Sequence, residues 1–490
     1  MALGPAESVA ALSLSLHGRR IGILAHYTRG RNMLTFDPSY VVAQPEDRPT
    51  FTLPQLASSR YFEKPLACSQ RLPPVLSNLL PEGAMRSHMA KVLKTHPDNE
   101  FPLFAWVGQD LPGALIATPI KAGEIPGWAL AGGLPAEPVQ IDAKALAQTF
   151  SLAGVQVKFS SSKKDGRFNI GAGDGNGDWI VKTPSTIHTD VPANEYSMME
   201  LARSMGIMVP ETALVPLSDL DNLPAIALPK EQWAYAIRRF DRSPGGRIHA
   251  EDFAQVFGQY AHDKYSRQSY ESVARALGMF SRDRLGDAQE MARRLLVNTL
   301  LGNGDAHLKN WSLIYPDQQH PELAPAYDIV FTKPYVHEDG NALNMDKTKV
   351  WKHLSMASFE RWAKKADISW SAVKPHLKVA MEKARDVWPK QIRDLPLNER
   401  QKSLLREHWG TLSPDFRIEV SKPWQTETHS TSRTAKGRGG DQKDGESVAG
   451  GRCQPERQDH LFETHDPETN IDDHLDEAEE NDDSPGPSPF

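Results

Sequence analysis

The sequence predicts an α+β protein in which a small α/β subdomain precedes a β-rich lobe and then a helical lobe. Between Ala143 and Ala250 strand-like runs dominate. Beyond Ala250, apolar residues recur three and four positions apart, as in amphipathic helices. The 490 residues are 39% hydrophobic and 24% charged, which suits a globular protein with a sizeable core. No run approaches the roughly 18 apolar residues that span a bilayer, so no membrane association is expected.

The first predicted subdomain begins with strands and continues with helices. The alternating ALSLSL at 11–16 indicates a strand, and RNMLTF at 31–36 continues this pattern after a turn. Helical spacing at 85–96 ends at a proline. Prolines and glycines crowd residues 118–138, so we place a boundary there and expect an N-terminal subdomain over 1–140.

The second predicted domain, 141–425, opens with strands at 155–160 and 179–182 and a helix at 193–205. Between the two strands lies the glycine-rich KKDGRFNIGAGDGNGD. No helix follows it directly and it lacks a phosphate-binding glycine motif, so we interpret it as a long, flexible hairpin tip. Backbone amides of the small-residue turn in SLAGVQVK, residues 151–158, are better placed to approach a phosphate.

The C-terminal segment differs sharply in composition from the rest of the chain. Residues 426–490 contain 17 Asp and Glu against 6 Lys and Arg, a net charge of −11. Because the whole chain carries −7, the remaining residues carry +4. With so few apolar residues, this acidic tail is predicted to be disordered. A mildly basic body is no strong nucleic-acid footprint. The two cysteines, Cys68 and Cys453, exclude a disulfide framework, and without a signal-peptide pattern the expected compartment is the cytoplasm.

The stretch GNGDAHLKNWSL carries the most informative spacing. Asp305 and Asn310 are five residues apart, as are the catalytic Asp and the metal-binding Asn of protein-kinase catalytic loops. Asp305 can accept a proton from an attacking hydroxyl, and the Asn310 amide oxygen can reach a magnesium ion. Lys309 can offset charge on a transferring phosphoryl group. The alternative for this stretch is a polar turn between a helix and a strand.

Three further residues complete a set in kinase order. Asp328, at the expected end of a short strand in LAPAYDIVF, can serve as a second magnesium ligand, or it is a turn or helix-capping aspartate. Lys182 in DWIVKTPS can contact phosphate when oriented by Glu195, 13 residues later, or it extends to solvent. The order Lys, Glu, Asp, Asn, Asp favours phosphoryl transfer over the separate alternatives.

Blocks of sequence up to about residue 420 resemble the HipA family of serine/threonine-protein kinase toxins. They are SNLLPEG, FAWVGQDLPGAL, SLAGVQVK, IVKTP, NEYSMMELARSMGIMVP, IRRFDR, RIHAEDFAQVFG, GNGDAHLKNWSL and LAPAYDIV. The resemblance implies a two-lobed, protein-kinase-like fold behind the N-terminal subdomain, with ATP and Mg2+ as cofactors. It implies that Asp305 is the catalytic base, that Lys309 is a catalytic residue with it, and that Asn310 and Asp328 are metal ligands.

The same resemblance implies a nucleotide site and a regulatory serine. The implied nucleotide-contacting residues are Lys182, Glu195, Ala153, Gly154, Val155, Gln156, Lys158, Arg238, Phe240 and His307. Ser151 stands where the family carries an autophosphorylated serine, whose phosphate would repel ATP from the loop; its alternative is a helix-capping or plain turn serine. Arg238 replaces an acidic residue of well-studied relatives, which puts the mode of adenine recognition in doubt.

The implied partners are a small helix-turn-helix antitoxin of the HipB type and operator DNA, the latter only through the antitoxin complex. The implied substrate is a protein of translation such as an aminoacyl-tRNA synthetase. Two other functions stay open: a catalytically silent scaffold that acts as a corepressor, and a small-molecule phosphotransferase. The retained catalytic set argues against the first, and the N-terminal subdomain argues against the second.

Overall fold

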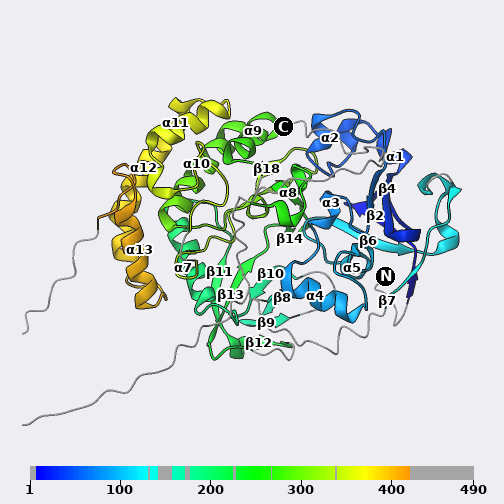
Figure 1. Ribbon diagram of the computed structural model, residues 1–490, viewed down its shortest axis with the longest axis horizontal. Coiled ribbons are helices and arrows are strands. Elements are labelled where there is room, and N and C mark those ends of the chain that lie inside the picture. Colours follow the sequence, from blue (N-terminus) through cyan, green and yellow to red (C-terminus); the bar gives the residue numbers. More distant parts are fainter. Residues whose placement is uncertain are drawn as a thin grey trace, which may run out of the picture. The chain divides into compact units, whose positions relative to one another are not determined.

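The computed structural model describes most of the chain up to Glu419 (Figure 1). The described residues are 7–130, 133–141, 157–170, 177–223, 228–265, 267–336 and 339–419. The loop 151–156, the glycine-rich residues 171–176 and the tail 426–490 lie outside them, so the expectations for these segments stay predictions.

The N-terminal part contains an antiparallel five-stranded sheet in the order β5-β4-β3-β2-β6. Its strands are β2 (Ala11–Leu16), β3 (Arg19–Tyr27), β4 (Arg31–Phe36), β5 (Leu66–Ser69) and β6 (Leu115–Ile120). Beside it β1 (Glu7–Val9) pairs with β7 (Val139–Ile141). The helices are α1 (Pro38–Val41), α2 (Pro54–Ala57), α3 (Pro74–Ser77), α4 (Gly83–Val92) and α5 (Glu100–Val107). Leu12 and Leu24 of the sheet share one buried core with Phe101 and Phe104 of α5.

A second sheet, in the order β11-β13-β10-β8-β9-β12, forms the β-rich lobe. Its strands are β8 (Lys158–Lys164), β9 (Arg167–Ile170), β10 (Trp179–Lys182), β11 (Thr212–Pro216), β12 (Leu220–Asp221) and β13 (Trp233–Arg238). The first part of the expected flexible tip is therefore a strand. Phe168 and Ile170 alternate with polar residues and are buried, which gives β9 an apolar face for the lobe's core.

Helix α7 (Val191–Ser204) packs on β11 and β13 of this sheet, as Figure 1 shows. Pro192 lies in its first turn, and Gly206, with φ +80°, follows its end in the left-handed conformation that glycine adopts without steric cost. The predicted helix over 193–205 is confirmed.

The helical lobe is built around α10 (Arg284–Leu301), which contacts α9, α12 and α13. The surrounding helices are α9 (Tyr270–Phe280), α11 (Met356–Lys365), α12 (Trp370–Gln391) and α13 (Glu399–Thr411). Trp362, Trp388 and Trp409 are fully buried among them. A small antiparallel sheet joins this lobe, with β16 (His249–Asp252), β17 (Ser312–Tyr315) and β18 (Glu322–Leu323); α8 (Phe253–Val256) follows β16.

A buried ionic cluster links the turn after α5 to the segment after β13, which also forms the short hairpin β14 (Arg242–Ser243) and β15 (Gly246–Arg247). Asp241 accepts hydrogen bonds from the Gly113 amide (2.8 Å) and from Arg239 and Arg242. Gly113 has φ +73°, and a Cβ there would lie 2.8 Å from the Ala250 backbone nitrogen. The backbones around Gly113 and Ala250 therefore lie in close contact.

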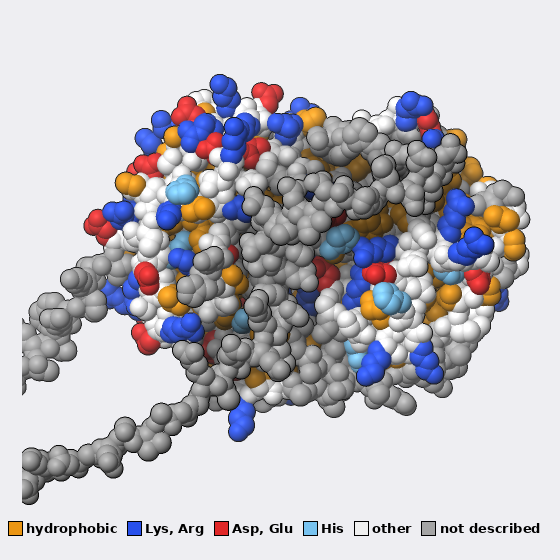
Figure 2. All heavy atoms as spheres, viewed as in Figure 1, with side chains coloured by type: hydrophobic (Ala, Val, Ile, Leu, Met, Phe, Trp, Pro, Cys, Tyr) orange, Lys and Arg blue, Asp and Glu red, His pale blue; other side chains and the backbone are white. Residues whose placement is uncertain are grey.

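Among the described residues on the left part of the side drawn in Figure 2, Lys and Arg lie interspersed with Asp and Glu. Within the described ranges, no helix combines the length and the apolar content needed to cross a membrane.

Candidate active site

The loop that carries Asp305 begins where α10 ends. Gly302 adopts the left-handed conformation (φ 58°) and its N–H bonds carbonyls of the last helical turn, which stops the helix. Asn303 then accepts a hydrogen bond from the Asp305 amide (3.0 Å). Asn310, in a short 3-10 turn (Leu308–Asn310), donates its side-chain N–H to the Asp305 carbonyl (2.6 Å). The loop folds back so that Asp305 and Asn310 lie in the same bend. Because the Asn310 side-chain N–H is used in this hydrogen bond, its amide oxygen is the atom suited to bind a metal.

The Asp305 carboxylate is partly enclosed, with about 24% of its side chain exposed. Its Oδ1 accepts a hydrogen bond from the Tyr265 hydroxyl and lies 3.6 Å from His307 Nε2. Burial raises its pKa to about 6, although the Tyr265 bond and the Lys264 charge oppose this rise. The titratable groups that act on Asp305 are Lys264, Tyr265, His307, Asp328, Asp339 and Glu82. A base with a pKa near neutrality suits proton acceptance at ordinary pH.

Lys182 joins the two other predicted carboxylates. Its Nζ lies 2.6 Å from Glu195 Oε1 on α7 and also pairs with Asp328 Oδ1. Burial alone would lower the pKa of Lys182, but the charges of Asp328 and Glu195 outweigh it and raise the pKa. Burial likewise opposes ionisation of Asp328, yet Lys182 holds the pKa of that carboxyl well below its usual range. The structure thus brings together three residues that are 13 and 133 positions apart in the sequence.

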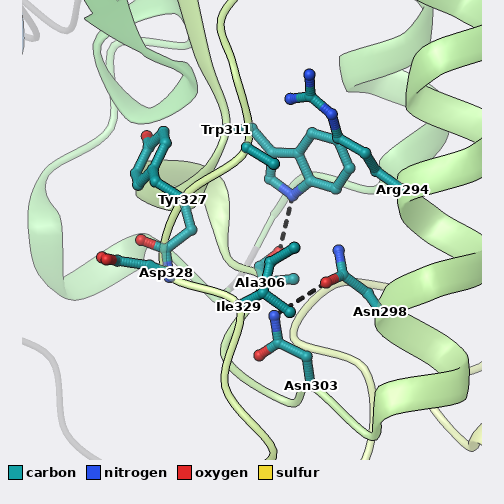
Figure 3. Close-up of a pocket in the computed structure, with 10 residues that line it drawn as sticks. Arg294, Asn298, Asn303, Ala306, Trp311, Tyr327, Asp328 and Ile329 are labelled. Atoms are coloured by element: carbon teal, nitrogen blue, oxygen red, sulfur yellow. Dashed lines mark hydrogen bonds between the residues drawn. The ribbon is translucent and has the colours of Figure 1, made fainter. Parts of the chain in front are cut away.

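Asp328 lies in an irregular segment after β18, so its expected place at a strand end was wrong. Pro325 interrupts strand pairing because it has no N–H to donate, and β18 stops at Leu323. Asp328 itself has φ 53°, a strained backbone conformation for a residue other than glycine. Figure 3 shows its side chain directed away from the helix that carries Arg294 and Asn298.

Asn310 and Asp328 line the same cavity, which is drawn in Figure 3. Its other lining residues are Arg294, Asn298, Asn303, Ala306, Trp311, Ala326, Tyr327 and Ile329. An amide oxygen and a carboxylate are the oxygen ligands that Mg2+ prefers, and one or two protein ligands plus phosphates make its usual shell. Asn310 and Asp328 therefore supply ligand atoms of the type that Mg2+ takes.

Asn194, beside Glu195 on α7, ties this helix to the segment that follows Asp328. Its Nδ2 donates to the Phe331 carbonyl and its Oδ1 accepts from the Phe331 amide, both at 2.9 Å. Asn194 is completely buried. Such a two-way amide bond fixes the distance between Glu195 and the Asp328 segment.

Lys309 is held by the N-terminal part of the chain. Its ammonium donates to the Asn78 carbonyl (2.9 Å) and lies 2.8 Å from Glu82 Oε1 and 3.8 Å from Asp252 Oδ2. About 11% of the Lys309 side chain is exposed. Its role at a transferring phosphoryl group stays a prediction. In the described structure its ammonium contacts Asn78, Glu82 and Asp252 instead.

The remaining predicted residues surround this centre in different ways. Lys158 stands opposite Lys182 across the β8–β10 pairing, and its charge lowers the pKa of Asp328. Phe240 packs on the Tyr327 ring, with 5.5 Å between ring centroids. Arg238 is half exposed and makes only long ion pairs to Asp178 and Glu211. His307 is buried, which lowers its pKa well below the usual value. Ser151, Ala153, Gly154, Val155 and Gln156 lie outside the described residues.

The sequence analysis missed Tyr265, Asn194, Asn78 and Glu82. Tyr265 and Asn194 belong to no spacing pattern that points to chemistry. Asn78 and Glu82 lie in SNLLPEG, which was noted only as a block of resemblance. Their partners are more than 180 residues away in the sequence, so only the fold reveals these contacts.

The fold and this constellation place the chain in the two-lobed, kinase-like class of proteins. A family model described as the HipA N-terminal domain matches residues 12–118, and one described as the HipA-like C-terminal domain matches residues 150–388. The chain belongs to the HipA family.

Relatives of several organisms agree with this assignment. Y4dM of Sinorhizobium fredii is 39% identical over 409 residues, covering 82% of this chain and 97% of that protein. The serine/threonine-protein kinase toxin HipA of Shewanella oneidensis is 27% identical over 299 residues, covering 54% of this chain and 64% of that protein. A solved complex of HipA, HipB and operator DNA from Shewanella oneidensis matches with a TM-score of 0.60 and 21% identity, over 81% of this chain and 94% of that one, and supports the fold.

Proposed function

We propose that the chain is an ATP- and Mg2+-dependent serine/threonine protein kinase that acts as the toxin of a HipBA-like toxin–antitoxin pair. The observation that carries the proposal is the contact of Lys182 with both Glu195 and Asp328. Asp328 also lines the cavity that Asn310 lines. Asp305 lies close enough for Asp328 to influence its pKa. This is the arrangement that phosphoryl transfer requires, because positioning and charge stabilisation supply most of its catalysis.

Each residue has a definite task in this proposal. Asp305 accepts the proton of the attacking hydroxyl, and its pKa of about 6 keeps it mostly ionised at neutral pH. Lys182, oriented by Glu195, binds phosphate oxygens, and Asn310 and Asp328 hold the metal. Magnesium, when bound, neutralises charge on the phosphates. Lys158, Arg238, Phe240, His307 and the loop residues Ala153, Gly154, Val155 and Gln156 complete the proposed nucleotide site.

Membership of the HipA family supports the proposed biological role. The solved relative stands in a complex with HipB and operator DNA, and the Shewanella protein is named a kinase toxin. By analogy we propose a helix-turn-helix antitoxin as partner, DNA contact only through that antitoxin, and a cytoplasmic location. The proposed substrate is a protein of translation such as an aminoacyl-tRNA synthetase, and Ser151 is the proposed site of autophosphorylation.

The test is incubation of the purified full chain with magnesium and labelled ATP, beside an Asp305→Asn variant, followed by mass spectrometry of the peptide containing Ser151. Labelled phosphate on the wild type alone is the expected result. A parallel measurement with a fluorescent ATP analogue determines nucleotide affinity for both proteins. Nucleotide binding with no phosphate transfer to the chain or to an added aminoacyl-tRNA synthetase preparation would refute the kinase and favour the scaffold. Transfer to small acceptors only would favour the small-molecule phosphotransferase.

A further inference from the structure

The Glu82 carboxylate joins Lys309 of the Asp305 loop to Lys264, which lies next to Tyr265. Glu82 directly precedes α4 in the N-terminal part of the chain. Its Oε1 lies 2.8 Å from Lys309 Nζ and its Oε2 lies 2.9 Å from Lys264 Nζ. One carboxylate therefore uses both oxygens to connect two lysines that are 45 residues apart in the sequence.

Both lysines are directly connected to the proposed catalytic groups. Lys264 precedes Tyr265, whose hydroxyl binds Asp305, and the Lys264 carbonyl accepts a hydrogen bond from the Leu308 amide (3.2 Å). Lys309 precedes Asn310, whose side chain bonds the Asp305 carbonyl. Displacement of either lysine moves a neighbour of Asp305.

The surroundings of Lys309 make Glu82 hard to replace. The Lys309 and Asp252 side chains are only 11% and 12% exposed, and Asn78 is buried. Burial opposes ionisation of Glu82, whose side chain is still about 36% exposed, but Lys309 and Lys264 hold the pKa of its carboxyl well below the usual range. Without Glu82, the ammonium loses the nearest carboxylate among the described residues and keeps Asn78 and the more distant Asp252.

We infer that Glu82 of the N-terminal subdomain is a positioning residue for phosphoryl transfer, fixing the loop of Asp305 and Asn310 through Lys309 and Lys264. This inference rests on the proposed kinase function. It gives the N-terminal subdomain a part in the active site of the other domain. Nucleotide binding in the absence of magnesium, which depends mainly on Lys182 and the β-rich lobe, is less dependent on this contact than phosphate transfer is.

The experiment compares the full-length wild type with Glu82→Gln and with Glu63→Gln as a matched control. Glu63 belongs to the same subdomain and pairs with Arg60 on the surface, with 53% of its side chain exposed. Autophosphorylation with labelled MgATP gives the transfer rate, and a fluorescent ATP analogue gives the dissociation constant. Hydrogen–deuterium exchange of peptides covering 303–312 reports on the loop itself.

For Glu82→Gln we expect a transfer rate roughly 10- to 100-fold lower, because small misplacements of reacting groups have effects of this size. The nucleotide dissociation constant should stay within about twofold, and exchange should accelerate in 303–312 only. Glu82→Asp keeps the charge on a side chain that is one methylene shorter. Its transfer rate should lie between those of the wild type and Glu82→Gln. Glu63→Gln should match the wild type.

Two results would overturn the inference: an unchanged transfer rate in Glu82→Gln, or faster exchange spread over the whole chain, which would make Glu82 a general stability residue. If the wild type transfers no phosphate, the kinase proposal fails by itself. The exchange of 303–312 then still decides whether Glu82 fixes the loop. If Glu82→Gln does not fold, Glu82→Asp and Lys309→Gln provide the same comparison from either end of the ion pair.

Discussion

Replacing Tyr265 by Phe tests how the fold sets the basicity of Asp305. The substitution removes the hydroxyl that donates to Asp305 Oδ1 and retains the ring, which packs edge-on against His307 with 4.9 Å between centroids. The Tyr265 bond favours the ionised carboxylate and so lowers its pKa, against the larger effect of burial. Without the bond, the pKa of Asp305 should rise above its present value of about 6.

The size of the change follows from the strength of a hydrogen bond to a charged group, about 1.5–3 kcal/mol. Asp305 is about one quarter exposed, so we take the lower end of that range. One pKa unit corresponds to about 1.4 kcal/mol, so the pKa should move from about 6 to roughly 7. Near pH 6 the variant then has roughly fivefold less ionised Asp305 than the wild type, and near pH 8.5 the difference almost vanishes.

The assay is the pH dependence of kcat/KM for phosphate transfer from MgATP, measured for the wild type and for Tyr265→Phe. A loss confined to the acid limb is the expected signature, since the base must be deprotonated to act. Tyr61→Phe removes a hydroxyl in the N-terminal subdomain and serves as the control.

A uniform loss of activity at every pH would refute this reasoning, because it would show that Tyr265 orients Asp305 without tuning its pKa. Unchanged activity at low pH would show that Asp305 is not the group that titrates.

Two further predictions concern stability. Asp305 has its pKa raised from the ordinary 3.8 to about 6, so its ionised form destabilises the fold as the pH rises through that window. Asp305→Asn should therefore abolish transfer yet stabilise the protein near pH 8 by about 2 kcal/mol, with the gain declining below pH 6. Denaturant midpoints at several pH values measure this, and a gain independent of pH would contradict it. Lys182→Met leaves the buried Glu195 carboxylate and the partly enclosed Asp328 carboxylate without their cation, which should cost about 3 kcal/mol. Thermal unfolding and nucleotide titration measure both losses, and wild-type stability would show that the pair contributes nothing.

The sequence predicted those parts of the site that depend on local spacing. Asp305 and Asn310 share one turn, and Lys182 and Glu195 lie on a strand and the helix that follows it, so their order along the chain carries information. The position of Asp328 was predicted less well, because only pairing in three dimensions decides where β18 ends. The partners of Lys309 could not be predicted, since Asn78 is 231 residues away and electrostatic pairing across domains leaves no periodic pattern. The first part of the glycine-rich segment was misjudged because its glycines masked the alternation of Phe168 and Ile170.

The bond between Asn194 and Phe331 has a consequence for control of the protein. In many kinases the helix equivalent to α7 swings outward and breaks the Lys–Glu pair to switch activity off. Here such a swing would leave the buried Asn194 amide and the Phe331 peptide group without partners, at about 1–3 kcal/mol for each group. The assembled arrangement is therefore the resting state of the described chain. Under the proposed function, an off state then arises outside this helix, by blocking the nucleotide or the acceptor.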